Sequence, residues 1–142
     1  MSMKKFLVFL LLFASLLLTA CGKKESAPQE VDVDLSSLGG AIVFGKIYDM
    51  MNNSEKYEGQ VIRMAGTVNE IRITQKGVLV DTLYSCFVTD AEGCCPQGIE
   101  FVMAEGHEYP PLGEKVVVEG VWNNYSLYGL SRARLINAKI KK

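Results

Sequence analysis

Two different periodicities of apolar residues divide the chain. Between positions 37 and 53, apolar side chains recur every three or four residues, which predicts a short amphipathic helix ending near Asn52. The stripe comprises Ile42, Val43, Ile47, Met50 and Met51. From Gln60 onward apolar and polar residues alternate, as in strands that bury one face. The change of period predicts one helix followed by a sheet.

The alternating part predicts five strands. The first begins at Gln60 and changes parity near Asn69, which predicts a bulge or bend there. The other strands are expected at 78–90, 98–104, 115–122 and 127–140, with turns at 75–77, 92–93, 110–111 and 123–124. Gly66 and Gly120, in the middle of the first and fourth strands, would let those strands curl. The pattern therefore predicts a mainly β fold, a small five-stranded OB-like Greek-key barrel preceded by one short helix.

Two segments resemble known OB domains. Residues 57–68, YEGQVIRMAGTV, look like the opening of secreted OB-fold domains of the tRNA-anticodon-like kind, in which a short helix precedes Tyr-x-Gly and then Gly-x-Val. Residues 90–101, DAEGCCPQGIEF, are similar to a double-cysteine segment of small bacterial OB-like proteins of unassigned function. OB folds usually carry a helix between the third and fourth strands, and residues 105–113, with two prolines, leave no room for one.

The N-terminus has the three-part layout of a secretory signal. Lys4 and Lys5 precede a 13-residue apolar run at 6–18, which is shorter than the roughly 20 apolar residues that cross a bilayer. Leu18-Thr19-Ala20-Cys21 then resembles the lipobox of bacterial lipoproteins, whose cysteine carries diacylglycerol and becomes the first residue after cleavage. The resemblance implies a signal peptide at 1–20 and acyl chains on Cys21 that hold the protein in the cell membrane, facing the extracytoplasmic side.

Composition assigns the remaining segments. Residues 21–36 are polar and charged and contain Pro28, so we expect a lipidated flexible tether, followed by the OB-like domain at 37–142. Cleavage removes Lys4 and Lys5 from the 15 basic residues and leaves 13 against 16 acidic ones, a formal charge of −3. A protein that binds a phosphate backbone needs a positive surface, so no nucleic acid partner is expected.

Three cysteines remain once Cys21 is lipidated: Cys86, Cys94 and Cys95. The extracytoplasmic space permits disulfides, but an odd number leaves one thiol free or unusually paired. A bond between Cys94 and Cys95 would be strained, because neighbouring Cα atoms are about 3.8 Å apart and disulfides prefer roughly 4.4 to 6.8 Å. Cys86 pairs with either only if the chain folds back, and its parity directs it toward the core.

The same residue types allow a metal site. Cys94, Cys95 and His107 would present thiolate and imidazole ligands to zinc, with Cys86 or Glu100 as the fourth ligand. Adjacent cysteines on a strand point to opposite faces, so only a tight turn would aim both inward. His107 lies in a polar loop, where we expect it to be exposed. A zinc or thiol-redox protein using the Cys94-Cys95 pair is therefore the alternative function, and no other cofactor is expected.

Aromatic and amide residues gather near the predicted last turn. Trp122, Tyr125 and Tyr128 flank Asn123-Asn124. In OB domains this loop borders the ligand face, where aromatic rings stack on bases or sugars. A hairpin stabilised by cross-strand aromatic pairs would account for the same cluster.

Charged residues complete the candidate chemistry. Arg132 and Arg134 share one strand face, where they would either meet an anionic ligand or cover the core with their stems. No serine or cysteine can be matched with a base and an orienting group, so an enzyme is not expected. The sequence predicts a membrane-anchored, non-catalytic binding module that holds an extracytoplasmic protein or glycan near Trp122, Tyr125 and Tyr128.

Overall fold

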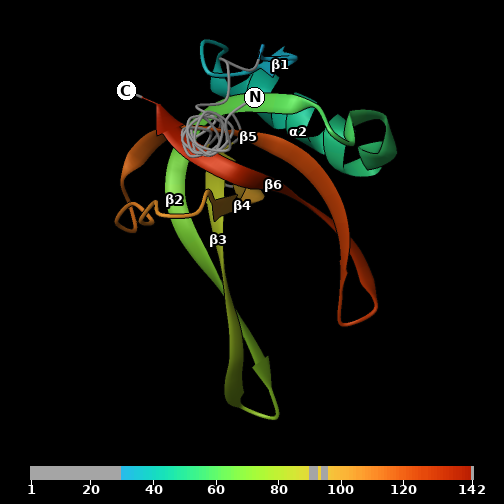
Figure 1. The fold of residues 1–142 in the computed structure, drawn as a ribbon, viewed down its shortest axis with the longest axis vertical. Coiled ribbons are helices and arrows are strands. Elements are labelled where there is room, and N and C mark those ends of the chain that lie inside the picture. The colour runs from blue at the N-terminus through green and yellow to red at the C-terminus, as the bar shows by residue number, and fades with distance from the viewer. Residues whose placement is uncertain (1–29, 90–92, 94–95, 142) are drawn as a thin grey trace, which may run out of the picture.

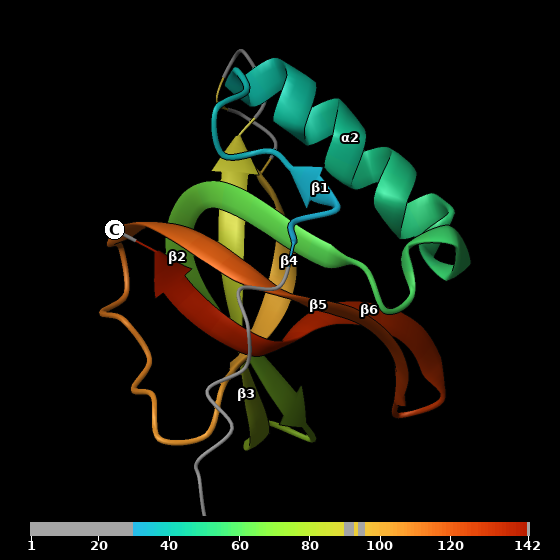
Figure 2. The ribbon, with the colours of Figure 1, turned by 45° about the horizontal axis from the view of Figure 1, so that its top comes forward.

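A computed structural model describes residues 30–89, 93 and 96–141. Five long strands curl into a barrel, and a helix lies over one end of it (Figure 1, Figure 2). The elements that precede the barrel are β1 (Val33–Asp34), α2 (Gly40–Asn52) and the 3-10 turn η2 (Ser54–Tyr57). The barrel strands are β2 (Val61–Gln75), β3 (Val78–Thr89), β4 (Pro96–Met103), β5 (Lys115–Leu127) and β6 (Leu130–Lys141).

The strand order confirms the predicted fold class. The sheet runs β2-β3-β4-β6-β5, and β5 pairs again with β2, which closes the barrel. Neighbouring barrel strands are antiparallel except β4 and β6, which are parallel. This is a five-stranded Greek-key barrel of OB type preceded by one helix. Residues 104–114, between β4 and β5, form a loop without a helix, as their prolines predicted.

The helix contributes to the barrel core. α2 buries Val43, Ile47 and Met50 and contacts β3 and β4, while Ile42 and Met51 of the predicted stripe are exposed. The N-cap residue, Gly39, has no side chain to cap the first turn, so the helix is stabilised by packing of its apolar face. No helix within the described ranges is both long and apolar enough to cross a membrane. The largest side chains of the barrel core are Trp122, Phe101, Ile62, Met64, Ile99 and Leu135.

Gly66 lies where β2 exchanges one partner for another. The strand pairs with β5 up to Thr67 and with β3 from Thr67 onward. A Cβ atom at Gly66 would lie 2.6 Å from the carbonyl oxygen of Phe87 and 2.7 Å from Sγ of Cys86. Only glycine permits this approach, so the position predicted for curling is where the barrel bends. Gly120 likewise coincides with a register shift between β5 and β6.

The bulge predicted near Asn69 is not there. Pairing of β2 with β3 is unbroken from Thr67 to Ile73, and the register shifts between Ile73 and Thr74 instead. The change of parity has another cause. Beyond Val68 the two strands leave the barrel as a projecting hairpin, where no core determines which face is apolar (Figure 1).

Both long hairpins end in two-residue turns. Lys76-Gly77 has φ of 51° and 80°, and Tyr128-Gly129 has φ of 52° and 81°, which are the positive values of type I′ turns. The first turn was predicted. The prediction of a turn at Asn123-Asn124 is wrong, because both residues lie within β5. The Asn124 amide donates to the Ser54 carbonyl, so it joins the strand to η2 instead of reversing the chain.

The packed domain begins upstream of the predicted boundary at residue 37. Val33–Asp34 forms β1, which pairs in parallel with β2, and Leu35 is buried. The Asp32 carboxylate accepts a hydrogen bond from the Val61 amide at 2.7 Å. The predicted tether therefore overlaps the short edge strand β1, which pairs with β2. The predicted signal peptide and Cys21 lie outside the described residues.

Candidate functional site

Trp122 does not belong to a ligand-binding surface. Its side chain is 0% exposed, and its ring packs against Tyr57 with centroids 5.9 Å apart. The indole N–H donates to Oδ1 of Asn124 at 3.3 Å. This corrects the prediction for Trp122, because the pleat of β5 directs position 122 into the barrel and positions 123 and 125 outward.

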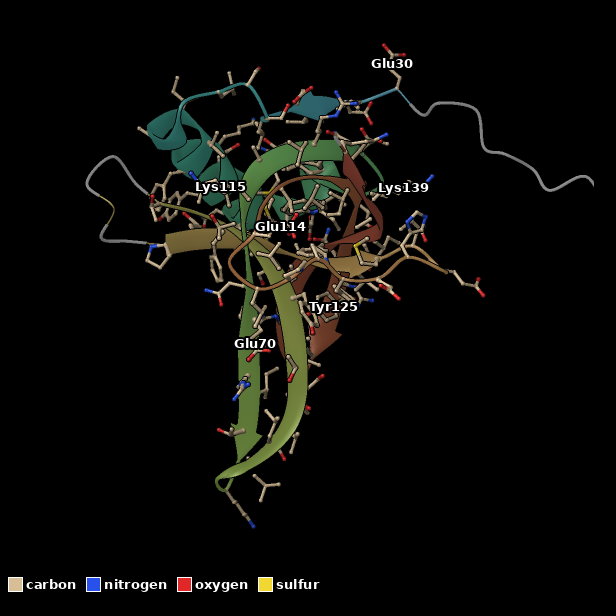
Figure 3. The ribbon with its side chains drawn as sticks, turned by 90° about the vertical axis from the view of Figure 1, so that its left-hand side faces the viewer. Glu30, Glu70, Glu114, Lys115, Tyr125 and Lys139 are labelled. Atoms are coloured by element: carbon tan, nitrogen blue, oxygen red, sulfur yellow. The ribbon has the colours of Figure 1, made fainter. Side chains whose placement is uncertain are left out.

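The other two predicted aromatic residues are accessible but occupy different places. Tyr128 is at the turn of the β5–β6 hairpin and is 55% exposed. Tyr125 is partly buried on the outer face of the sheet. In Figure 3, Tyr125 lies toward the end of the barrel from which the β2–β3 hairpin projects, whereas Glu30 lies at the opposite end.

The strand register places a polar row around Tyr125. Each residue of the row pairs with the next residue on the neighbouring strand. Each also stands next to a core residue of its own strand, and because side chains alternate between the two faces of a strand, the row lies on the outer face of the barrel. It runs across the five strands as Asn69, Ser85, Glu100, Arg134 and Asn123. Residues far apart in sequence thus form one continuous polar strip.

Glu100 is the centre of this strip. The residue is only 7% exposed, and one oxygen accepts two hydrogen bonds from the Arg132 guanidinium, from Nε at 2.7 Å and from Nη2. The other oxygen accepts the Tyr125 hydroxyl. Burial raises the pKa of the Tyr125 hydroxyl, and its bond to the Glu100 carboxylate raises it further. Burial alone would lower the pKa of Arg132, but the hydrogen bond and charge of Glu100 raise it.

The sequence suggested Glu100 as a fourth zinc ligand, or as one of several acidic residues that flank the double cysteine. The structure uses both of its oxygens to hold Arg132 and Tyr125, so the carboxylate is an organising group. The signal available in the sequence was a single acidic residue within the apolar run Ile99–Val102, which a buried strand tolerates only if the charge is paired. Its partner, 32 residues away, was not predictable from that run.

Arg134 borders a small pocket beside this ion pair. Its guanidinium carbon lies 4.1 Å from the centroid of the Tyr125 ring, and its Nε donates to Oδ1 of Asn123 at 3.3 Å. The pocket has a volume of about 70 Å³. Besides Arg134 and Glu100, it is lined by Thr82, Leu83, Tyr84, Phe101, Val102 and Tyr109.

Two apolar hairpin ends flank the outer face. The β2–β3 hairpin exposes Val78, Leu79 and Val80, and the β5–β6 hairpin exposes Tyr128 and Leu130. Both hairpins extend away from the end that carries β1 and α2 (Figure 1, Figure 2). Exposed aliphatic side chains on projecting elements are typical of surfaces that contact other proteins.

The cysteine predictions are met only in part by the described residues. Cys86 is fully buried, as its parity predicted. His107 is exposed, as expected. Cys94 and Cys95 lie outside the described residues. Among the positions that are described, no three His, Cys, Asp or Glu side chains gather as metal ligands. Zinc binding or thiol chemistry at Cys94-Cys95 therefore stays a prediction.

The Cys86 thiol is expected to resist alkylation in the folded protein. Burial raises its pKa from 9.0 to about 12, so at pH 8 nearly all of it is the unreactive protonated form. In a Cys94→Ser/Cys95→Ser variant, mass spectrometry should find Cys86 unmodified by iodoacetamide at pH 8 and fully modified after unfolding in guanidinium. Rapid modification without denaturant would contradict its burial.

A wide groove of about 940 Å³ lies between the start of α2 and the barrel. Its walls are mostly apolar and include Thr89 and Pro96. These two residues border the double-cysteine segment, which is largely outside the described residues. The polar strip, whose side chains are all described, is therefore the better-defined candidate site.

Comparisons with known proteins leave this assignment to the geometry. No family model matches the chain, and neither a curated protein nor a solved structure matches it.

Proposed function

We propose that the protein is a membrane-anchored, extracytoplasmic, non-catalytic binding module. Its binding surface is the outer barrel face around Tyr125 and Arg134, together with the two hairpin ends. One observation carries the proposal: a polar cluster, held in place by the buried Glu100 carboxylate, lies between two projecting apolar hairpins. Tyrosine and arginine side chains that are held in place near the centre of a surface are typical hot spots of protein interfaces.

The chemistry of the cluster supports binding over catalysis. A general acid or base needs a group free to exchange a proton with substrate, and both oxygens of Glu100 already accept hydrogen bonds. The Tyr125 hydroxyl donates to that carboxylate, and its raised pKa keeps it protonated near neutral pH. The cluster is suited to presenting fixed donors and an aromatic ring to a partner.

The exposed residues favour a protein over a glycan as partner. Sugar rings stack on flat aromatic faces, whereas the hairpin ends present mainly the aliphatic side chains of Val78, Leu79 and Leu130. Tyrosine and arginine beside aliphatic groups is the composition of protein interfaces. Glu30 is the described residue nearest to Cys21 along the chain. The binding surface lies at the opposite end of the barrel from Glu30 (Figure 3).

The anchor is tested separately. Native protein should carry acyl chains on an N-terminal Cys21, and Cys21→Ser should release the chain from the membrane fraction, because two or more acyl chains give stable anchoring. Intact-mass measurement and carbonate extraction check both results. An unmodified Cys21, or a retained leader, would contradict the anchoring part of the proposal.

The binding surface is tested by photo-crosslinking in the cells that make the protein. A crosslinking amino acid at Leu79 or Leu130 should give a discrete adduct with a partner protein, because both side chains are exposed on the hairpins. Tyr48, which is 61% exposed on α2, is the matched control and should give none. Protease digestion of the adduct identifies a protein partner, and loss of the adduct only after glycosidase treatment would indicate a glycan. Equal adducts from all three positions would contradict a specific surface.

A further inference from the structure

Arg134 differs from the other arginines of the chain. The sequence has four, at positions 63, 72, 132 and 134. The first three each have a carboxylate oxygen within hydrogen-bond distance, from Glu119, Glu70 and Glu100 respectively. Among the described residues, no carboxylate oxygen lies within 4.0 Å of the Arg134 guanidinium. Within the described part of the chain, Arg134 is thus a cation without a carboxylate partner.

The Arg134 guanidinium is nevertheless held in one place. It stacks over the Tyr125 ring, and Nε donates to Asn123, so the two terminal nitrogens remain as donors. Tyr125 is itself held by Glu100. Because the fork geometry of guanidinium matches a carboxylate, a pre-positioned arginine needs little ordering to bind one.

The surroundings fit an anionic group of small size. The charges of Glu100 and Arg132 cancel within their ion pair, which leaves Arg134 as the excess positive charge of the cluster. The adjoining pocket of about 70 Å³ has room for roughly two water molecules, or a carboxylate of similar bulk.

We infer that Arg134 recognises a carboxylate of the partner protein, an aspartate or glutamate side chain whose neighbouring apolar residues contact the hairpin ends. This inference rests on the proposed function and specifies the chemistry of its partner. Bidentate hydrogen bonds to Arg134 supply orientation, and Tyr84, Tyr109 and Val102 surround the rest of the acidic side chain.

The test uses the mature protein in detergent micelles and two matched probes, the peptides acetyl-Leu-Asp-Leu-amide and acetyl-Leu-Asn-Leu-amide. The four arginine Nε–H signals are followed by NMR during titration. The Arg134 signal should shift saturably with the aspartate peptide, and affinity for the asparagine peptide should be at least about tenfold weaker, as expected for loss of a charge-assisted hydrogen bond. Arg134→Gln should remove the response, while Arg63→Lys, at an arginine that pairs with Asp34 of β1 and lies away from both hairpins, should leave it unchanged.

Three results would overturn the inference: equal affinity for the two peptides, shifts of Arg63 as large as those of Arg134, or an unchanged response in the Arg134→Gln variant. A further measurement separates it from the proposed function. If adducts at Leu79 and Leu130 form normally in cells carrying Arg134→Gln, the surface binds its partner without this contact, and only the carboxylate inference is wrong. If wild-type protein forms no adducts, the proposed function is wrong whatever the peptides do.

Discussion

Replacement of Trp122 by alanine is expected to lower the free energy of unfolding by about 3 to 5 kcal/mol, as for large aromatic side chains lost from a core. Trp122 is 0% exposed and is the largest fully buried side chain of the domain. Its loss would also leave Tyr57 without a ring partner and Asn124 without a donor. Since small domains are stable by about 5 to 15 kcal/mol, a large part of the stability would be lost. Urea denaturation followed by circular dichroism measures the change.

Trp122→Phe is the matched control. It keeps an aromatic ring in the core and removes only the indole N–H and some volume, so its cost should be about 1 to 2 kcal/mol. In the unaltered protein Trp122 is the one tryptophan, so its emission should be blue-shifted and poorly quenched by acrylamide. A Trp122→Ala cost below about 1 kcal/mol, or emission typical of an exposed indole, would contradict the inward orientation of this residue.

Glu100→Gln is expected to destabilise the protein by about 2 to 3 kcal/mol, because it leaves the Arg132 guanidinium without its counter-charge. The value lies below that for a fully buried pair, since the Arg132 side chain is 30% exposed and water screens part of its charge. The substitution also weakens the bond from Tyr125, so the pKa of the Tyr125 hydroxyl should fall toward its ordinary value. Urea denaturation and ultraviolet titration of tyrosine provide the two readouts.

Glu70→Gln is the comparison for Glu100→Gln. Glu70 pairs with Arg72, whose side chain is 68% exposed, so this substitution should change stability by no more than about 0.5 kcal/mol. In a double-mutant cycle, adding Arg132→Gln to Glu100→Gln should restore part of the lost free energy of unfolding, because the cation without a counter-charge is then removed. Equal effects of Glu100→Gln and Glu70→Gln would mean that the Glu100 pair does not organise the outer face.

The candidate site was only partly predictable. Tyr125, Tyr128, Arg132 and Arg134 were singled out because aromatic and basic residues cluster in one stretch of sequence. Trp122 was grouped with them because it is near in sequence, yet the pleat directs it to the other face. The Asn123-Asn124 pair suggested a turn for the same local reason, whereas both asparagines serve as hydrogen-bonding residues within β5.

The sequence by itself determined the features that depend on neighbouring residues: one amphipathic helix, alternating strands, the Lys76-Gly77 turn and glycines where strands bend. Periodicity states which residues share a face, and turn residues state where the chain reverses. Only the tertiary structure decided where the core ends along β2, how the strands align, and that Glu100 meets Arg132 beside Arg134. Those contacts depend on the closure of the barrel, which joins strands whose relative register no local pattern contains.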